Sequence, residues 1–458
     1  MTDRPPSESH ARETGPAFGL ATATFLVVSG MIGTGVLTTS GFTVYFVGSN
    51  QLMLALWVVG GVLAVCGGLT LCELTTMLPN SGGDYVYMRE AYGPLPAFLS
   101  GWVSFLIGFG APIAASSVAA AHYLLAPAEL PEPLAGPGRA VLASAAILAL
   151  TAVHSLGRRS SIVAQAGMTS IKLAILVALA AAGLIAGQGG WTNLSDRPPL
   201  TGDLLVAMAS SLVYISYAYT GWNTAAYVAG EVTQPQVTMP RAILLGSGLV
   251  LAVYLALNTA YALALSAADV RSIVDQAGSL EAVAPIAQLM ASRLFGPRVA
   301  GPLSVALGLT LLASVSAYVL AGPRVAAAMA RDGLFPAAAG RVSDRGVPVV
   351  AAVAQAAWAI LLVWTASFER MLVFAGVGLA MSSMLAVGAI FVLRRRRPEL
   401  PRPFRTPGYP LVPALYLLGT GLLTVAVIAQ RPLESGLSLA AIAAGIPLYR
   451  ATRQPGRG

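Results

Sequence analysis

The chain has 458 residues, of which 56% are hydrophobic and only 10% are charged, with a mean hydropathy of +0.74. Soluble domains carry about 25% charged residues, so the composition excludes an ordinary soluble protein and indicates an integral membrane protein. The formal charge of +8 does not indicate a nucleic-acid partner, because the arginines lie in short loops between apolar runs and follow membrane topology.

The apolar runs, of about 20 residues each, predict about twelve membrane-spanning helices rather than barrel strands. In chain order the earlier spans are expected at 18–47, 50–78, 98–125, 139–154, 162–187, 203–231 and 242–265. The later spans are expected to centre near Leu311, Ala357, Ala380, Leu417 and Ala441. A short surface helix is predicted at 279–294, before the eighth span. The first run is too long for a cleavable leader, so we expect it to be retained.

Alternate loops of a multi-pass protein lie on the same side of the membrane, and most of the loop arginines fall in one such set of loops. The two termini are expected on the same side as this set. These arginines are Arg158, Arg159, Arg324, Arg331, Arg341, Arg345, the run 394–397, Arg402 and Arg405. The positive-inside rule therefore predicts a multi-pass protein of the cell (inner) membrane with both termini in the cytoplasm. The run 394–397 could instead be a nuclear-localisation or lipid-binding patch, but at the end of a spanning helix topology explains it better.

Residues 30–35, Gly-Met-Ile-Gly-Thr-Gly, interrupt the first apolar run. Each glycine costs a helix about 1 kcal/mol relative to alanine, so a continuous helix is not expected here. In hydrocarbon, non-helical backbone is tolerated only where it is buried in protein or lines a cavity. This segment is therefore either a site of close helix packing or a binding site.

A second interruption, Ser-Tyr-Ala-Tyr-Thr-Gly-Trp-Asn at 216–223, lies in the sixth span. Two interrupted spans at corresponding places in two halves of a chain are typical of inverted-repeat transporters. Free N–H groups at the start of a half-helix suit a carboxylate, and free carbonyls at the end of one suit an ammonium. Together the two breaks could bind both ends of a zwitterionic amino acid. Close packing of small residues is the alternative.

Several motifs along most of the chain resemble one known family. They are Gly-Met-Ile-Gly-Thr-Gly-Val-Leu at 30–37, Leu-Cys-Glu-Leu-Thr-Thr-Met-Leu-Pro at 71–79, Ser-Gly-Gly-Asp-Tyr-Val-Tyr at 81–87, Tyr-Thr-Gly-Trp-Asn at 219–223 with Gly-Glu at 230–231, Ala-Arg-Asp-Gly-Leu-Phe-Pro at 330–336, and the arginine-rich loop at 397–410. The sequence resembles the amino acid–polyamine–organocation (APC) superfamily, specifically its L-type amino acid transporter (LAT) branch.

The resemblance implies an all-α integral membrane fold with a LeuT-like 5+5 inverted repeat and broken first and sixth helices. The expected divisions are a cytosolic tail at 1–16, the first repeat at 17–187, the second repeat at 203–393, two further helices at 409–449 and a cytosolic tail at 450–458. The loop before the fourth span has no cysteine, so the disulfide-linked accessory subunit of animal members is not expected. Cys66 and Cys72 both lie in the second span.

The resemblance also implies a set of substrate contacts: Met31, Gly33, Thr34, Gly35, Tyr217, Ala218, Thr220 and Trp222. The N–H groups and hydroxyl near Thr34 and Gly35 would bind the substrate carboxylate. Carbonyls of Met31, Tyr217 and Thr220 would bind its ammonium, and the Tyr217 ring would cover it. Thr220 stands where the family often has glycine, which would shrink the side-chain pocket and favour smaller substrates.

Lys172, the only lysine in the chain, lies in the fifth span about ten residues from Ser161, or about 15 Å along a helix. An ammonium at such depth costs about 2.5–3.5 kcal/mol on insertion scales, so it should have a partner or face water, and it could exchange a proton. We hypothesise that it contacts carbonyls near Gly30 and couples the broken helix to the scaffold. A lysine in a wet vestibule with no role is the alternative. In the resembled family a lysine here replaces sodium, which argues against sodium coupling.

Other polar residues have less specific expected roles. Glu73 and Glu231 lie at the cytosolic ends of their spans, where they would anchor loops or form a gate. Ser314, Ser316 and Tyr318 in the eighth span would either line the pocket or hold helices together.

These features predict a secondary active transporter of small neutral L-amino acids that works by alternating access, through sodium-independent exchange or proton symport. A cationic amino acid or polyamine transporter is the alternative, but no mid-span acid offers a counter-charge. A membrane enzyme is not indicated, because the histidines lie far apart and no Ser/His pair occurs at mid-depth; no catalytic residue, metal site or cofactor is predicted. A sensor or scaffold would need a cytosolic domain, which the short tails do not hold.

Overall fold

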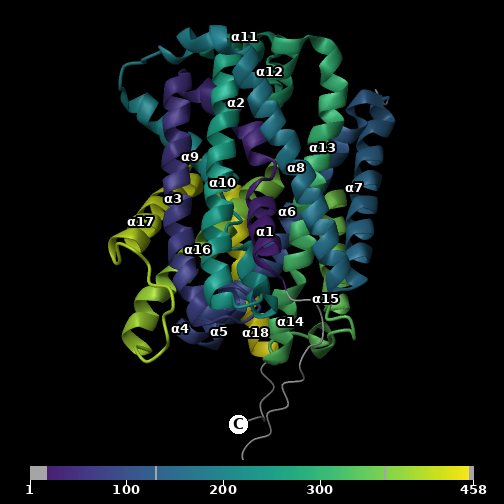
Figure 1. The fold of residues 1–458 in the computed structure, drawn as a ribbon, viewed down its shortest axis with the longest axis vertical. Helices are drawn as coiled ribbons and strands as arrows, with labels where there is room; N and C mark the ends of the chain where they lie inside the picture. The colour runs from purple at the N-terminus through teal and green to yellow at the C-terminus, as the bar shows by residue number, and fades with distance from the viewer. Residues whose placement is uncertain (1–17, 129–130, 366–367, 453–458) are drawn as a thin grey trace, which may run out of the picture.

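The computed structural model describes residues 18–128, 131–365 and 368–452. These ranges form an all-helical bundle (Figure 1) with no strand, and the one extended contact within them is a bridge between Phe18 and Val232. Of the described helices, nine are long and apolar enough to cross a membrane, and Gly202–Ala218 and Val349–Thr365 are shorter apolar helices. The predicted all-α multi-pass fold is confirmed. The predicted tails, 1–16 and 450–458, lie wholly or mostly outside the described residues.

The first half of the chain supplies the following helices. They are α1 (Leu20–Met31), α2 (Gly35–Val47), α3 (Asn50–Met77), α4 (Asp84–Tyr92), α5 (Pro94–Val103), the π-helix Ser104–Gly110, α6 (Ala111–Leu125), α7 (Glu132–Ser155) and α8 (Arg158–Ala186). α1 and α2 share one apolar run and are separated by the expected break, so together they make the first span.

The second half begins at the second break. Its helices are α9 (Gly202–Ala218), the 3-10 helix Thr224–Glu231, α10 (Pro235–Ala264), α11 (Ala267–Ala277), α12 (Ile286–Phe295), α13 (Ala300–Ala321), α14 (Pro323–Arg331), α15 (Val349–Thr365), α16 (Phe368–Arg396), α17 (Leu411–Gln430) and α18 (Pro432–Thr452). α9 and the 3-10 helix after it make the interrupted sixth span.

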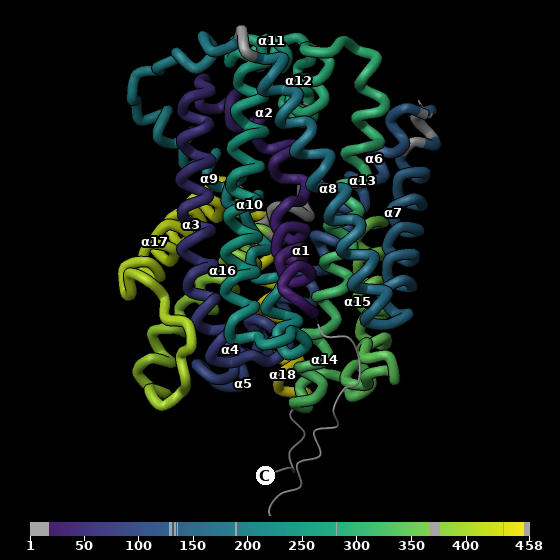
Figure 2. Tube along the Cα trace, in the orientation of Figure 1, coloured from purple at the N-terminus to yellow at the C-terminus, as the bar shows by residue number. Residues whose placement is uncertain are grey.

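The broken elements lie at the centre of the bundle. α1 is packed against α8, α10 and α13, and α2 against α9, so long helices surround both breaks (Figures 1 and 2). α11 and α12 cap one end of the molecule, while α4, α5 and α14 lie at the other. At the N-terminal end, the Phe18 N–H donates to the Glu231 backbone carbonyl, and the Glu231 carboxylate pairs with Arg324 of α14. At the C-terminal end, α18 packs against α5. Both described ends of the chain therefore lie at the α14 end.

The predicted surface helix at 279–294 is wrong in its bounds. One helix, α11, precedes the predicted range, and α12 covers its second half. α11 begins with a capping box between Ser266 and Asp269 and ends at Ala277, before Gly278, whose φ of +63° favours glycine. α12 begins only after Pro285, because proline has no N–H to continue a helix from the preceding turn. Hydrophobic periodicity alone did not reveal these two boundaries.

Two further local features were not predicted. The segment after the Gly82-Gly83 pair forms helix α4, although its short, polar sequence resembles a loop. The third span contains the π-helix Ser104–Gly110 between α5 and α6. Such π-turns within α-helices are frequent at functional sites, and this one lies beside the central breaks.

Candidate functional site

The first break leaves backbone groups of both polarities free near the centre of the bundle. α1 ends at Met31, and Ile32 has a non-helical ψ of 89°. α2 then begins at Gly35, with Thr34 as its N-cap residue. The last carbonyls of α1 and the first N–H groups of α2 lack intrahelical partners, so they can bind other groups.

The second break lies opposite the first. α9 ends at Ala218, and the chain turns through Gly221, whose φ of +99° is readily adopted only by glycine. The Thr220 hydroxyl donates to the Tyr217 carbonyl at 2.7 Å, which closes the end of α9. A 3-10 helix from Thr224 then completes the span.

The two breaks also pack closely against each other. A Cβ on Gly30 would lie 2.2 Å from the Thr224 hydroxyl oxygen, and one on Gly35 would lie 2.4 Å from the Ala218 Cβ. No side chain fits at such distances, so the small residues are needed for the approach of the two segments. Close packing and a cavity thus occur together in this region.

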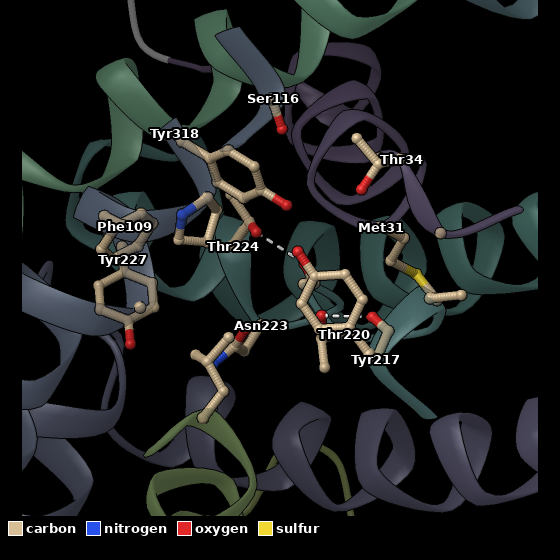
Figure 3. A pocket seen from close by; sticks show the side chains of 17 residues that line it. Met31, Thr34, Phe109, Ser116, Tyr217, Thr220, Asn223, Thr224, Tyr227 and Tyr318 are labelled. Atoms are coloured by element: carbon tan, nitrogen blue, oxygen red, sulfur yellow. Dashed lines mark hydrogen bonds between the residues drawn. The ribbon is translucent and has the colours of Figure 1, made fainter. Parts of the chain in front are cut away.

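A small cavity of about 30 Å³ lies between the breaks (Figure 3). None of the residues that line it has a charged side chain. They are Met31, Gly33, Thr34, Gly35, Gly108, Phe109, Pro112, Ser116, Tyr217, Ala218, Thr220, Gly221, Asn223, Thr224, Tyr227, Tyr318 and Leu379. The hydroxyl groups of Thr34, Ser116 and Tyr318 point toward the same space. The cavity therefore offers hydroxyl and backbone groups, but no ionised side chain.

Most of the predicted substrate contacts lie together at this cavity. Those that line it are Met31, Gly33, Thr34, Gly35, Tyr217, Ala218 and Thr220. Trp222 does not; it packs edge-on against Tyr416, with ring centroids 5.8 Å apart, and lines a larger neighbouring cavity. Gly30 lies behind the cavity, in contact with Gly221 and Thr224.

Two of the carbonyls predicted to bind an ammonium are already engaged by protein donors. The Met31 oxygen lies 2.9 Å from the Gly33 N–H nitrogen and 2.8 Å from the Tyr254 hydroxyl. The Tyr217 oxygen accepts from both the N–H and the hydroxyl of Thr220. Because a carbonyl has two lone pairs, these oxygens have no further capacity. Three carbonyls were predicted to bind the ammonium. Among the described residues, only the one of Thr220 accepts no hydrogen bond from the protein.

Tyr254 of α10 joins the two breaks. Its hydroxyl also lies 2.9 Å from the Ala218 carbonyl, so its hydrogen is shared between the end of α1 and the end of α9. The side chain is fully buried and packs edge-on against Trp57. This tyrosine lies in an ordinary apolar span, and no sequence signal distinguished it from a core residue.

Lys172 reaches the unwound end of α1 from α8. Its side chain is fully buried, and its ammonium nitrogen lies 2.5 Å from the Ile32 carbonyl, 3.5 Å from the Ser29 carbonyl and 2.6 Å from the Ser314 hydroxyl. No carboxylate in the described part of the chain forms an ion pair with it. The contacts are to Ser29 and Ile32 rather than to Gly30, whose carbonyl accepts from Tyr318.

A buried polar chain continues from the same point toward the α14 end. Ser29 bonds to Thr169, and the Gln165 amide donates to the Thr169 hydroxyl. The Ser316 hydroxyl donates to the side-chain amide oxygen of Gln165, Oε1, and also bonds to His154 Nε2. Ser316 therefore holds helices together, while Tyr318, two residues later, lines the cavity.

The larger cavity, of about 870 Å³, extends from the second break to the end that carries α11 and α12. It shares Tyr217, Thr220 and Asn223 with the small cavity, and Arg139 lies in its wall. At the opposite end, Glu231 pairs with Arg158 and Arg324. The large cavity thus lies on the side of the breaks that faces α11 and α12, and these ion pairs lie on the side that faces α14.

Sequence reasoning missed the contribution of the third span. Gly108, Phe109, Pro112 and Ser116 all line the small cavity. The run Gly-Phe-Gly-Ala-Pro at 108–112 carried a usable signal, because glycine and proline inside a span mark places where backbone bonds are freed. Among the described residues, no group of His, Cys, Asp or Glu side chains could hold a metal ion.

Comparison with known proteins gives an independent result. A sequence model described as "Amino acid permease" matches residues 18–446. The chain is 28% identical over 443 residues to the large neutral amino acids transporter small subunit 2 of Homo sapiens, covering 94% of this chain and 79% of that protein. It is 28% identical over 439 residues to the serine/threonine exchanger SteT of Bacillus subtilis, covering 94% and 95%. It is 29% identical over 449 residues to the Asc-type amino acid transporter 1 of Mus musculus, covering 94% and 80%.

Proposed function

The chain belongs to the amino acid permease family, as its motifs indicated, and we propose that it exchanges small neutral L-amino acids across the membrane without sodium. The names of two relatives support a neutral amino acid as substrate: one is a serine/threonine exchanger, which also favours a small side chain, and the other is a transporter of large neutral amino acids. The family is one of permeases, so the protein is a transporter and not an enzyme.

The uncharged cavity between the two breaks is the observation that carries the substrate class. All of its lining side chains are neutral, so a cationic side chain or a polyamine buried there would contact no anionic side chain of the lining, at considerable desolvation cost. A zwitterion differs, because its two charges can be met by helix ends. This favours a neutral amino acid over the cationic alternative.

The start of α2 is the proposed carboxylate site. The N–H groups at Thr34 and Gly35 belong to the N-cap and the first residue of α2, where partial positive charge accumulates. The Thr34 hydroxyl faces the cavity beside them. For the ammonium we propose the Thr220 carbonyl, with hydroxyl oxygens of Ser116 and Tyr318, because the Met31 and Tyr217 carbonyls already accept two bonds each.

Sodium independence is proposed from the surroundings of Lys172. The carbonyls of Ser29 and Ile32 and the hydroxyl of Ser314 are hard oxygen donors of the kind that a small cation would use. The ammonium of Lys172 already contacts all three. A sodium ion at this place would have to displace a tethered positive charge.

Orientation and partners follow from charge and cysteine placement. The α14 end carries Arg158, Arg324 and Arg394, so we propose that it faces the cytoplasm, as the positive-inside rule requires. Cys66 and Cys72 are both buried in α3, so we propose no disulfide-linked accessory subunit. The division into inverted repeats at 17–187 and 203–393 stays a prediction.

The test is uptake into proteoliposomes that contain the purified protein. Labelled L-serine or L-alanine outside should enter when unlabelled substrate is inside, and much less without it, equally in sodium and potassium buffers. L-Arginine and putrescine should neither enter nor compete. Uptake of either cation in preference to alanine would contradict the proposed substrate class, and a sodium requirement would contradict the role of Lys172.

A further inference from the structure

Asp84 is a buried carboxyl group directly beneath the substrate cavity. It begins α4 after Gly82 and Gly83, which have φ values of +131° and +57°. A Cβ on Gly83 would lie 2.8 Å from the Tyr227 ring, so only glycine lets this turn pack there. The turn thereby places Asp84, which is 2% exposed, against the second broken helix.

The hydrogen bonds of Asp84 connect it to the wall of the cavity. Its Oδ2 accepts from the Asn223 amide at 3.0 Å and lies 3.4 Å from the Tyr227 hydroxyl. Both of these residues line the cavity (Figure 3), and Tyr227 is held by Ser104 and by the edge of Phe109. Asp84, Asn223 and Tyr227, which we call the cavity floor, lie on the side of the cavity that faces α14, because the Gly82 N–H donates to the Tyr227 carbonyl and Gly82 lies against Ala328 of α14.

The carboxyl has no positive partner. Among the described residues its Oδ1 is buried without a hydrogen bond, and no arginine or lysine pairs with it. Glu73 on α3 is equally buried, but both of its carboxylate oxygens are hydrogen-bonded and it has a positive partner. The two oxygens accept from Arg394, and one of them also accepts from the Thr406 N–H. A buried carboxylate with an empty acceptor and no counter-charge is strongly disfavoured relative to the neutral acid.

The titratable groups around Asp84 do not supply a positive charge. They are Tyr87 on α4 itself, Cys72 on α3, Tyr227 on the 3-10 helix and Tyr416 on α17. α5 has no titratable side chain. Arg394 on α16 pairs with Glu73, and Arg397, directly after α16, pairs with Glu90. Burial raises the pKa of Asp84 to about 7, although the bonds from Asn223 and Tyr227 oppose that rise.

We propose that Asp84 is a proton-binding site of the permease: it is protonated while the cavity floor is closed and releases the proton when the floor opens to water. Once hydrated, the carboxyl should return toward its ordinary pKa of about 3.9. The closed floor then binds more protons than the open one, so acid favours the closed floor. This preference is fully present below the pKa of the open form and is lost as pH rises through about 7.

The proposal rests on the proposed function in one respect, that the floor opens during transport. Exchange in proteoliposomes should become faster from pH 5.5 to 8, with the closed-to-open ratio changing by up to about tenfold per pH unit. Asp84→Asn, which resembles the protonated acid, should give slow exchange with no pH dependence. Glu90→Gln, the same change at the surface of the same helix, should keep the wild-type profile. A wild-type pH profile in Asp84→Asn would overturn the proposal.

A spectroscopic measurement keeps the proposal testable should Asp84→Asn fail to fold. Infrared spectra of the wild type labelled with ¹³C-aspartate should show an aspartic acid carbonyl band that is present at pH 6 and lost at pH 8.5, in Glu90→Gln as well. The absence of such a band would overturn the proposal. Absence of all amino acid uptake by the wild type, with the band still titrating, would instead contradict the proposed function alone.

Discussion

Gly30 of α1 and Gly221 of the second break pack backbone against backbone. A Cβ on Gly221 would lie 2.3 Å from the Gly30 carbonyl oxygen, which also accepts from the Tyr318 hydroxyl. The cavity is therefore built on a contact that tolerates no side chain on either segment. Both broken helices must keep this contact for the carboxylate and ammonium sites to face each other.

Substitution of Gly30 by alanine should reduce both stability and exchange. The added methyl group would overlap the Thr224 hydroxyl and the Gly221 carbonyl, and overpacking of this kind typically costs about 1–3 kcal/mol. Thermal unfolding of the purified protein and exchange in proteoliposomes measure the two effects. Gly248→Ala on α10, where nothing lies within 4 Å of the new methyl group, is the matched control. Equal behaviour of the two variants would argue against the packing account.

Removal of the Lys172 ammonium should impair both stability and transport. In Lys172→Ala the Ser29 carbonyl loses its buried donor, whereas the Ile32 carbonyl keeps the Ser314 hydroxyl. A buried group left unsatisfied costs about 1–3 kcal/mol. We expect exchange to fall by at least about tenfold, which corresponds to the lower part of that range. Ser314→Ala, which removes the third contact of Lys172 and the hydroxyl bond of Ser314 to the Ile32 carbonyl but keeps the ammonium, should lose less activity. Normal exchange by Lys172→Ala across the pH range would contradict a coupling role.

Thr220 should limit the size of the substrate side chain. Its side chain lines the small cavity, and an extra methylene in an apolar pocket changes affinity by about 10–200-fold. In Thr220→Gly, inhibition of alanine exchange by L-leucine should strengthen by about tenfold relative to inhibition by L-serine. An unchanged leucine-to-serine ratio would show that Thr220 does not set the pocket size.

The sequence was informative where membrane chemistry is strict. Hydrocarbon demands long apolar helices and permits non-helical backbone only at protected places, so the spans and both breaks could be predicted from composition and glycine placement. Lys172 was likewise conspicuous, because a lone ammonium at such depth needs partners. Its carbonyl contacts at Ser29 and Ile32 lie one residue before and two after the expected Gly30.

The remaining contacts depend on tertiary packing that residue types do not encode. Tyr254 resembles any buried tyrosine, yet its hydroxyl joins the ends of α1 and α9. The engagement of the Met31 carbonyl by that hydroxyl could not be foreseen for the same reason. Trp222 was placed with the substrate contacts by its neighbours in the motif, but its ring turns toward Tyr416.

The most direct test of the central claim is equilibrium binding of labelled L-alanine to purified Thr34→Pro. Proline removes the Thr34 N–H and restrains the entry into α2, while it is tolerated in the first turn of a helix. We predict that binding is abolished, whereas membrane insertion, elution as a folded protein and thermal stability remain close to the wild type. Wild-type affinity in Thr34→Pro would contradict a substrate site at the start of α2 and leave the segment 30–35 with a packing role alone.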